Sequence, residues 1–159
     1  MYDYKKLYSE IEAQETELQF DKFTNEDALS LGLLMVEEAK KQGKPVAIDI
    51  AKNNQVLFHY AFAGTTPDND GWIAGKKKTV GRFLKSSFYI ALKLLEANKT
   101  MEEKYRLSSL EYMPAGGAFP MIIRDTGVVG TITVSNLPQE DDHAFVAACI
   151  RMYLKRQLG

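Results

Sequence analysis

The chain has 159 residues, of which 45% are hydrophobic and 26% charged, with a formal net charge of -1. This length suits one domain over residues 1–159, which would bury roughly 70% of the surface that its unfolded chain exposes. The composition, with 11 Gly and 5 Pro, excludes collagen-like and disordered classes. The balance of 20 basic against 21 acidic residues gives no overall field for nucleic acid or an anionic membrane.

Cysteine content and hydropathy indicate the compartment. The single Cys149 cannot form an internal disulfide, which is typical of a reducing environment. The first residues, MYDYKKLYSEIEAQETE, are charged from Asp3 onward and lack the apolar segment of a secretory signal. No segment approaches the roughly 20 apolar residues that a membrane span requires. We therefore expect a soluble, cytoplasmic protein without a membrane partner.

The N-terminal third predicts two helices. Residues 2–17 are expected to form a polar helix within an arm over residues 1–20, lying on the surface or across a subunit boundary. Thr24 is a good N-cap for the second helix, and Asp27 completes a variant of the capping box. That helix is expected to end at Gly43, which is followed shortly by a proline.

Alternating apolar residues predict two β-hairpins. Residues 46–51 and 55–62 alternate in this way and are separated by a turn that contains two asparagines. A second pair, rich in Ile, Val and Thr, covers residues 119–124 and 128–135. Gly64–Gly71 holds the densest cluster of structure-breaking residues and is expected to be a loop.

The remaining segments predict helices and a second loop. Residues 72–97 are expected to be helical, with Ser86–Ser87 as the place where a break would fall. A capping box opens a short helix over 100–105, a loop follows at 113–118, and a last helix covers 140–157. Two hairpins separated by helices predict an α+β domain with a mainly antiparallel sheet flanked by helices.

Five separated motifs resemble one known family. In chain order they are VAIDIA (46–51), GTTPDNDGW (64–72), KKTVGRFLKSS (77–87), AGGAFP (115–120) and GVVGTITVSNLPQEDDH (127–143). This set resembles the GlcG/HbpS-like family, often labelled a haem-degrading domain. Within that family the chain looks closest to the uncharacterised cytoplasmic branch.

The resemblance implies a profilin-like α/β/α domain that assembles into homo-oligomers. No cofactor follows from the residues themselves, but some secreted relatives bind haem, so haem is the cofactor that the resemblance suggests. Their sensor role is not carried over to a chain without an export signal. Gly75 stands where relatives usually have a basic residue, so a ligand or subunit contact made by that residue is not carried over either.

The segment Asp68–Trp72 has two interpretations. Its oxygen-bearing side chains can cap the free N–H groups of the helix that follows. In the functional interpretation, Asp68 and Asn69 line a ligand pocket in which Trp72 is an apolar wall. Two aspartates without further ligands fall short of the roughly six oxygens that a hard cation takes, so no metal site is predicted.

Basic side chains concentrate between Lys76 and Lys85. Within this stretch Lys78, Arg82 and Lys85 share one helix face at i, i+4 and i+7. Such a face is either solvated or a clamp for a carboxylate or phosphate, in which Arg82 binds bidentately and Lys76 acts as a point charge. One patch on a slightly acidic chain does not predict a nucleic-acid partner.

The Gly116–Gly117 bend before Phe119 is the most informative loop. Two glycines permit positive φ and the close approach of a ligand or of another backbone segment. Their successive N–H groups can form a nest for an anion. A tight turn beside a neighbouring subunit explains the glycines equally well.

The two histidines allow few roles. His143 lies in the first turn of the last helix, where it is either structural or serves as an axial haem ligand or acid–base group. His59 lies in a strand, on the side opposite to Phe58 and Tyr60. One Cys and two His at these spacings do not support zinc. Ser86–Ser87 has no identifiable base, so catalytic residues remain unassigned.

These features predict a homo-oligomeric domain that binds haem or a small anionic metabolite. Its pocket would lie between Trp72, Arg82, the Gly116–Phe119 loop and His143. The alternatives are an oligomeric scaffold whose partner is another protein, and an enzyme that degrades haem or acts on a small acid. The leading hypothesis requires the Asp68–Trp72 turn and the double-glycine bend to meet around a concave hollow edged by cations.

Overall fold

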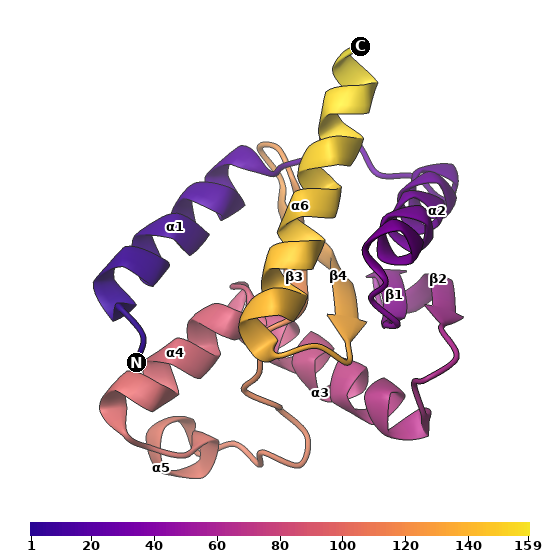
Figure 1. The fold of residues 1–159 in the computed structure, drawn as a ribbon. Coiled ribbons are helices and arrows are strands. Elements are labelled where there is room, and N and C mark those ends of the chain that lie inside the picture. The colour runs from indigo at the N-terminus through magenta and orange to yellow at the C-terminus, as the bar shows by residue number, and fades with distance from the viewer.

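The computed structural model describes residues 1–159 as six helices and four strands (Figure 1). The elements are α1 (Tyr4–Glu17), α2 (Asn25–Gln42), β1 (Ala47–Lys52), β2 (Gln55–Ala61), α3 (Pro67–Phe83), α4 (Ser87–Ala97), α5 (Met101–Tyr105), β3 (Ala118–Ile123), β4 (Gly127–Ser135) and α6 (Gln139–Leu158). None of the helices combines the length and apolar content that a bilayer crossing needs.

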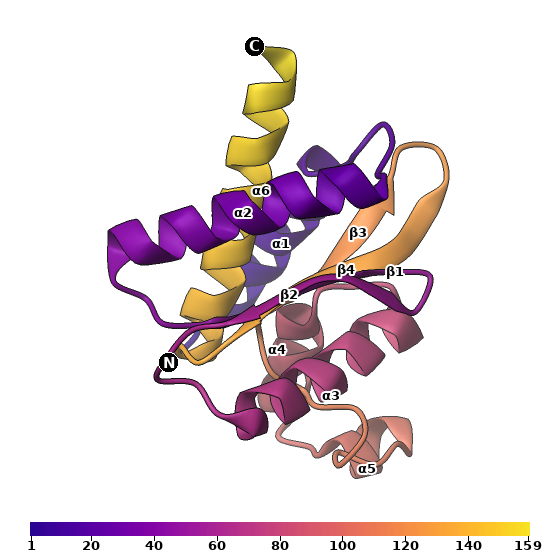
Figure 2. The same ribbon diagram turned by 90° about the vertical axis from the view of Figure 1, so that its right-hand side faces the viewer.

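Helices cover both faces of one sheet. The strands pair antiparallel in the order β2-β1-β4-β3. The helices α2 and α6 lie on one face, and α3 and α4 lie on the other (Figure 2). The predicted α+β class, with an antiparallel sheet built from two hairpins and flanked by helices, is therefore confirmed.

Turn residues at positive φ form both predicted hairpins. Asn53 and Asn54, with φ of 52° and 65°, connect β1 to β2. Asp125 and Gly127, with φ of 60° and 118°, connect β3 to β4. Asn, Asp and Gly tolerate this conformation better than other residues do, which is why the turns fall at these positions.

The main core lies between the sheet and the two helices α2 and α6. Its centre is formed by Ile48 and Ile50 of β1 and by Ile132 and Val134 of β4, all fully buried. At the edge of this layer, Gly32 lets α2 approach β2, because a Cβ there would lie 2.3 Å from the Phe58 ring. Burial of these apolar side chains is the dominant favourable contribution to folding.

One predicted loop is wrong in its second half. The cluster of breaking residues predicts an irregular segment over 64–71, but α3 begins at Pro67. The Thr66 hydroxyl accepts the Asp68 N–H at 3.3 Å, and the Asn69 side chain accepts the Thr66 N–H at 2.9 Å. Asp, Asn and Pro break a helix interior, but they favour its first turn. The cluster of breaking residues is thus the start of a helix.

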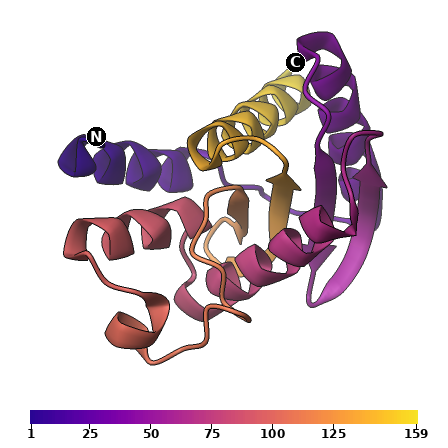
Figure 3. The same ribbon diagram turned by 60° about the horizontal axis from the view of Figure 1, so that its bottom comes forward.

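The helical segment predicted over 72–97 is two helices, divided just before Ser87 where the sequence allowed a break, and α1 stabilises the division. Leu84 ends α3 in the left-handed conformation, with φ of 55°. Glu15 of α1 then accepts two 2.7 Å hydrogen bonds from Ser86, one from its N–H and one from its hydroxyl. The same carboxylate lies 2.6 Å from Lys85 Nζ. Glu15 therefore caps the start of α4 from another element, and α1 and α4 lie side by side (Figure 3).

Candidate functional site

Two hollows lie beside α3, and the smaller one joins the two segments that the sequence singled out. It has a volume of about 350 Å³ and lies between the start of α3, the double-glycine bend and the start of α6. Its wall consists of Asp68, Asn69, Trp72, Lys76, Ala115, Gly116, Ser135, Asn136, Leu137, Gln139 and Asp142. The Asp68–Trp72 segment and the glycine bend thus meet around a concave space.

Lys76 connects the elements that surround the smaller hollow. Its side chain is only 2% exposed, and Nζ donates to Gly116 O at 3.1 Å, to Val134 O at 2.7 Å and to Asp142 Oδ2 at 3.3 Å. An ammonium group has three donors, so all of them are used within the protein. Lys76 therefore ties α3 to the bend, β4 and α6 and has no donor left to act as the free point charge that the sequence suggested.

Burial acts on both members of this ion pair. Desolvation lowers the pKa of Lys76, and the nearby Asp142 carboxylate opposes that shift. Desolvation also raises the pKa of Asp142 to about 6, although Lys76 and the Leu137 N–H, which donates at 3.1 Å, favour its charged form. Removing either side chain would destabilise the fold, because it would leave the other as a buried charge without a partner.

The glycines of the bend are required by neighbouring atoms of the protein. A Cβ on Gly117, whose φ is 130°, would lie 2.5 Å from Lys76 Nζ, and one on Gly116 would lie 2.3 Å from Gln139 O. The Gly116 N–H donates to Gln139 Oε1 at 3.1 Å, and the next N–H but one, of Ala118, donates to Ser87 Oγ at 3.0 Å. Two of the three successive N–H groups are thus used internally.

The remaining wall of the small hollow is polar and partly acidic. Asn69 uses its amide to donate to Ser135 Oγ at 3.3 Å, in addition to its capping contact with α3. Trp72 is 41% exposed at the rim, and Asp68 and Asp142 add carboxylates. With Lys76 fully engaged, this hollow has no cation that is free to meet a negative ligand.

His143 and Phe119 lie outside the small hollow, beneath α1. His143 is 4% exposed, its Nε2 lies 2.7 Å from Gln14 Oε1, and its ring packs on Phe88 and Phe119 at centroid distances of 5.3 and 5.9 Å. Its other nitrogen, Nδ1, is buried without a hydrogen-bond partner. Burial lowers the pKa of His143 to about 4. The neutral ring therefore donates its Nε2–H to Gln14.

The larger hollow lies farther along α3, and Arg82 belongs to it. We call it the Arg82 groove; it has a volume of about 750 Å³. It is lined by Ala51, Asn53, Asn54, Ala74, Lys77, Lys78, Gly81, Arg82, Leu84, Tyr112, Val128, Val129, Gly130 and Thr131. Arg82 is therefore not brought together with Trp72, the glycine bend and His143.

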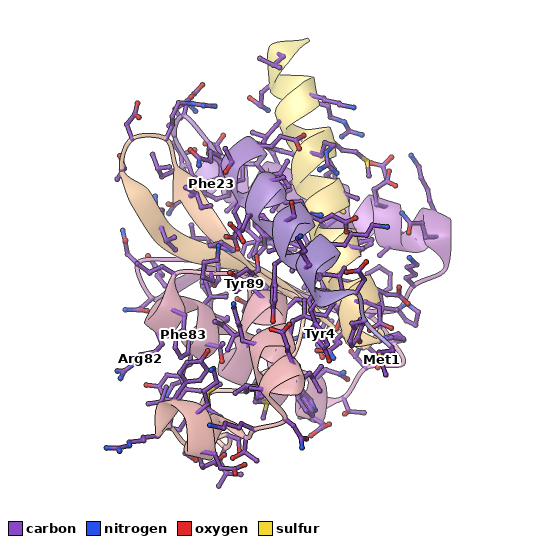
Figure 4. All side chains as sticks on the ribbon, turned by 90° about the vertical axis from the view of Figure 1, so that its left-hand side faces the viewer. Met1, Tyr4, Phe23, Arg82, Phe83 and Tyr89 are labelled. Carbon is purple, nitrogen blue, oxygen red and sulfur yellow. The ribbon has the colours of Figure 1, made fainter.

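Three cations line the Arg82 groove, and they differ in their partners. Lys78 pairs with Glu111 at 3.2 Å on the surface, and Lys77 Nζ lies 2.9 Å from Asp49 Oδ1. Arg82 has no carboxylate partner and extends from α3 into solvent (Figure 4). The sequence indicated the Lys78–Arg82 face through its spacing, but it gave no signal that loop and strand residues would complete a groove there.

Sequence reasoning also missed a charged network beside the groove. His59 of β2 faces the α3 side of the sheet, where its Nδ1 lies 3.2 Å from Asp49 Oδ2 and its Nε2 lies 3.2 Å from Asp70 Oδ1. The one available signal was Asp49, a carboxylate between Ile48 and Ile50 on the side of β1 opposite to those two apolar side chains. In the structure Asp49 is buried between His59 and Lys77.

Comparison with known proteins places the chain in a family. A family model described as "Haem degrading protein HbpS-like" matches residues 23–151. The chain belongs to the HbpS-like family. The resemblance inferred from the five motifs is therefore confirmed, and it extends over most of the chain.

Individual relatives agree with this assignment. The UPF0303 protein of Streptomyces avermitilis is 44% identical over 147 residues, which cover 92% of this chain and 90% of that protein. The crystal structure of the Ybr137w protein has a TM-score of 0.88 at 36% identity, covering 95% of this chain and 89% of that one. The crystal structure of the PduOC:haem complex has a TM-score of 0.65 at 16% identity, covering 81% and 93%, which shows a shared fold.

Removing Lys76 tests its role as a tether. Lys76→Met is expected to lower the free energy of unfolding by about 3–5 kcal/mol, because it leaves the Asp142 carboxylate buried without its cation. Urea denaturation at pH 7 measures this loss. In Lys76→Met/Asp142→Asn the unpaired charge is gone while the hydrogen bond from Leu137 can persist, so part of the loss should be recovered. A single variant as stable as the wild type would contradict this role.

The buried His143 predicts a pH dependence of stability. Burial lowers its pKa to about 4 in the folded state, against the ordinary 6.5 of an exposed imidazole, so the native state binds fewer protons than the unfolded state between these limits. The stabilisation is complete above pH 6.5 and is lost as the pH falls toward 4, by roughly 3 kcal/mol in total. In His143→Phe, which keeps an aromatic ring, denaturant unfolding between pH 4.5 and 7 should give a shallower slope. Parallel slopes for the two proteins would refute this account.

Proposed function

We propose that this chain is a homo-oligomeric binding domain for a small anionic ligand and that the Arg82 groove is its binding site. The observation that carries the proposal is Arg82 itself, an arginine without a carboxylate partner at the larger of the two hollows beside α3. A guanidinium group presents a planar fork of donors that matches a carboxylate or phosphate.

The charges favour the groove over the smaller hollow. The smaller hollow is lined by the exposed Asp68 and by Asp142, which is buried and paired with Lys76, and this lysine, the one cation of the hollow, is fully hydrogen-bonded. The groove contains three cations together with apolar surface, and its volume of about 750 Å³ suits a small metabolite. An anionic ligand is thus proposed, as the sequence predicts, but its site is the Arg82 groove and not the hollow between Trp72 and the glycine bend.

Haem is the ligand suggested by the family description and by the PduOC:haem complex. The residues of this chain do not fit haem as they stand. Neither of the two larger hollows is lined by His, Cys or Met. His143 is enclosed by Gln14 and two aromatic rings, and both nitrogens of His59 face carboxylates. We therefore assign no role to haem in the proposed site.

Anion binding can be measured directly. Thermal shift and isothermal titration calorimetry measure the binding of sulfate, glycolate and inorganic pyrophosphate. Haem binding is measured separately from the Soret absorption band. Arg82→Gln is expected to weaken binding of the best anion about 10-fold or more, the loss of a charge-assisted contact. Arg156→Gln, at an exposed position near the end of α6, is the matched control and should bind as the wild type does.

Three outcomes would overturn the proposal. One is that none of the anions binds to the wild type. Another is that Arg82→Gln binds the best anion as tightly as the wild type. The third is a haem complex whose Soret band is lost in His143→Ala, because it would show that α1 opens to expose that imidazole.

The homo-oligomeric part of the proposal rests on an exposed apolar surface at the free edge of the sheet. β2 is an edge strand, and α2 packs against it at the Gly32–Phe58 contact. The large apolar side chains exposed on these two elements are Leu29, Leu33, Val56 and Tyr60. We call them the α2–β2 patch. An open strand edge with apolar neighbours is a template for pairing with another chain.

A second copy of this chain fits the patch by charge. The first turn of α2 carries Glu26 and its last turn carries Lys40 and Lys41. A two-fold axis would pair the helices antiparallel, so the acidic end of one copy would face the basic end of the other. The same axis would allow the two β2 edges to pair antiparallel.

Self-association is tested by size-exclusion chromatography with light scattering. The wild type is expected to have the mass of an oligomer at micromolar concentration, and Val56→Lys and Leu33→Glu are expected to shift it toward the monomer. Leu110→Lys is the control, since Leu110 is 88% exposed in a loop outside the patch. A monomeric wild type, or an oligomer unaffected by both patch variants, would refute this interface.

A further inference from the structure

A chain of four ionisable side chains runs from the Arg82 groove to the surface. Lys77 of α3 lines the groove, and its Nζ lies 2.9 Å from Asp49 Oδ1. The other oxygen of Asp49, Oδ2, lies 3.2 Å from His59 Nδ1. His59 Nε2 in turn lies 3.2 Å from Asp70 Oδ1 on the first turns of α3. A charge placed in the groove is thus linked through Lys77 and Asp49 to an imidazole on β2.

The contact between Lys77 and Asp49 is an ion pair without a directed hydrogen bond. Asp49 Oδ1 is buried and receives no hydrogen bond of good geometry, although Lys77 Nζ is close. Lys77 is therefore held by charge and is not fixed in direction, so its ammonium group can turn toward an anion in the groove. That movement weakens the compensation of a buried carboxylate, which is costly unless another cation replaces it.

His59 can be that cation. A neutral imidazole has one N–H, yet both ring nitrogens of His59 face carboxylate oxygens. Only the protonated ring has an N–H on both nitrogens and a charge that attracts both carboxylates; the Asp49 contact has hydrogen-bond geometry, and the Asp70 contact is a charge contact. Asp49 and Asp70 each carry -1 and Lys77 carries +1, so the four groups sum to -1 with a neutral His59 and to zero with a protonated one. Protonation of His59 thus keeps Asp49 paired when Lys77 turns away.

Of the two histidines, His59 is the one whose ring nitrogens both face carboxylates. The chain has two histidines, and burial keeps the pKa of His143 at about 4. The charged groups that face His59 are Asp49 from β1 and Asp70 from α3, with Lys77 behind Asp49.

We propose that an anion binds in the Arg82 groove together with a proton on His59, so that the affinity for the anion rises as the pH falls. Lys77 contacts the anion, Asp49 transfers its pairing from Lys77 to His59, and the net charge of the network moves from -1 to zero. This inference rests on the proposed function, since it concerns the regulation of the same groove.

Sulfate is the probe, because it keeps its double negative charge over the whole range between pH 5.5 and 8. Isothermal titration calorimetry at constant ionic strength is expected to give about 5-fold tighter binding at pH 5.5 than at pH 8, the effect of one charge at the far end of the network. The heat measured in buffers of different ionisation enthalpy should show that a proton is taken up on binding. Equal affinity at both pH values would overturn the inference.

Two variants are expected to abolish the pH dependence of sulfate affinity, one by fixing the affinity at its weak level and the other by fixing it at its tight level. His59→Gln cannot be protonated, so it should bind sulfate at the weak level of the wild type at pH 8 throughout. Asp49→Asn removes the charge that competes for Lys77, so it should bind at the tight level throughout. His143→Gln is the matched control and should keep the wild-type dependence. A slope that survives in His59→Gln would contradict the assignment.

A measurement without ligand separates this inference from the proposed function. In Lys77→Met the full charge of Asp49 acts on His59, so the imidazole should hold its proton to a higher pH than in the wild type, as followed by NMR. An unmoved titration midpoint overturns the proton coupling even if sulfate binds. Conversely, a shifted midpoint with no sulfate binding at any pH supports the network and overturns the groove as an anion site.

Discussion

The buried ammonium group of Lys76 is the interaction on which the arrangement around α3 depends. It has three donors, and each finds an acceptor on a different element: the glycine bend, β4 and α6. A buried cation is tolerated only when it is paired and fully hydrogen-bonded, so these elements must meet at one point. Gly117 of the bend follows from the same requirement, because a Cβ there would lie 2.5 Å from Nζ.

The lysine run shows how the fold assigns different roles to identical side chains. Lys76 faces inward and is fully used, Lys77 pairs with a buried carboxylate, and Lys78 pairs with a surface glutamate. Arg82, one turn further on the same face as Lys78, has no such partner and lines the groove. The proposed specificity for an anion therefore comes from one uncompensated cation, since the net charge of the chain is only -1. Charge compensation inside the protein decides which cation is available.

The N-terminal helix has a definite structural role in this arrangement. Glu15 caps α4 by accepting both hydrogen bonds from Ser86, and the adjacent Gln14 accepts the hydrogen bond of His143. An arm that the sequence indicated only as polar therefore supplies a cap to one helix and a partner to another. Because α1 covers His143, this histidine, a candidate ligand by residue type, is enclosed and neutral.

The sequence by itself determined the elements, because caps, turns and hydrophobic periodicity are local. Thr24, the asparagine turn at 53–54 and the alternating strands predicted the helices and both hairpins, and the five motifs predicted the family. The start of α3 at Pro67 was missed, since the same residues favour loops and first helical turns. Only the tertiary structure decided that Lys76 is buried, that Arg82 lies in another hollow and that Asp49 faces His59. Those facts depend on which distant acceptors and carboxylates meet each side chain, and local spacing carries no information about them.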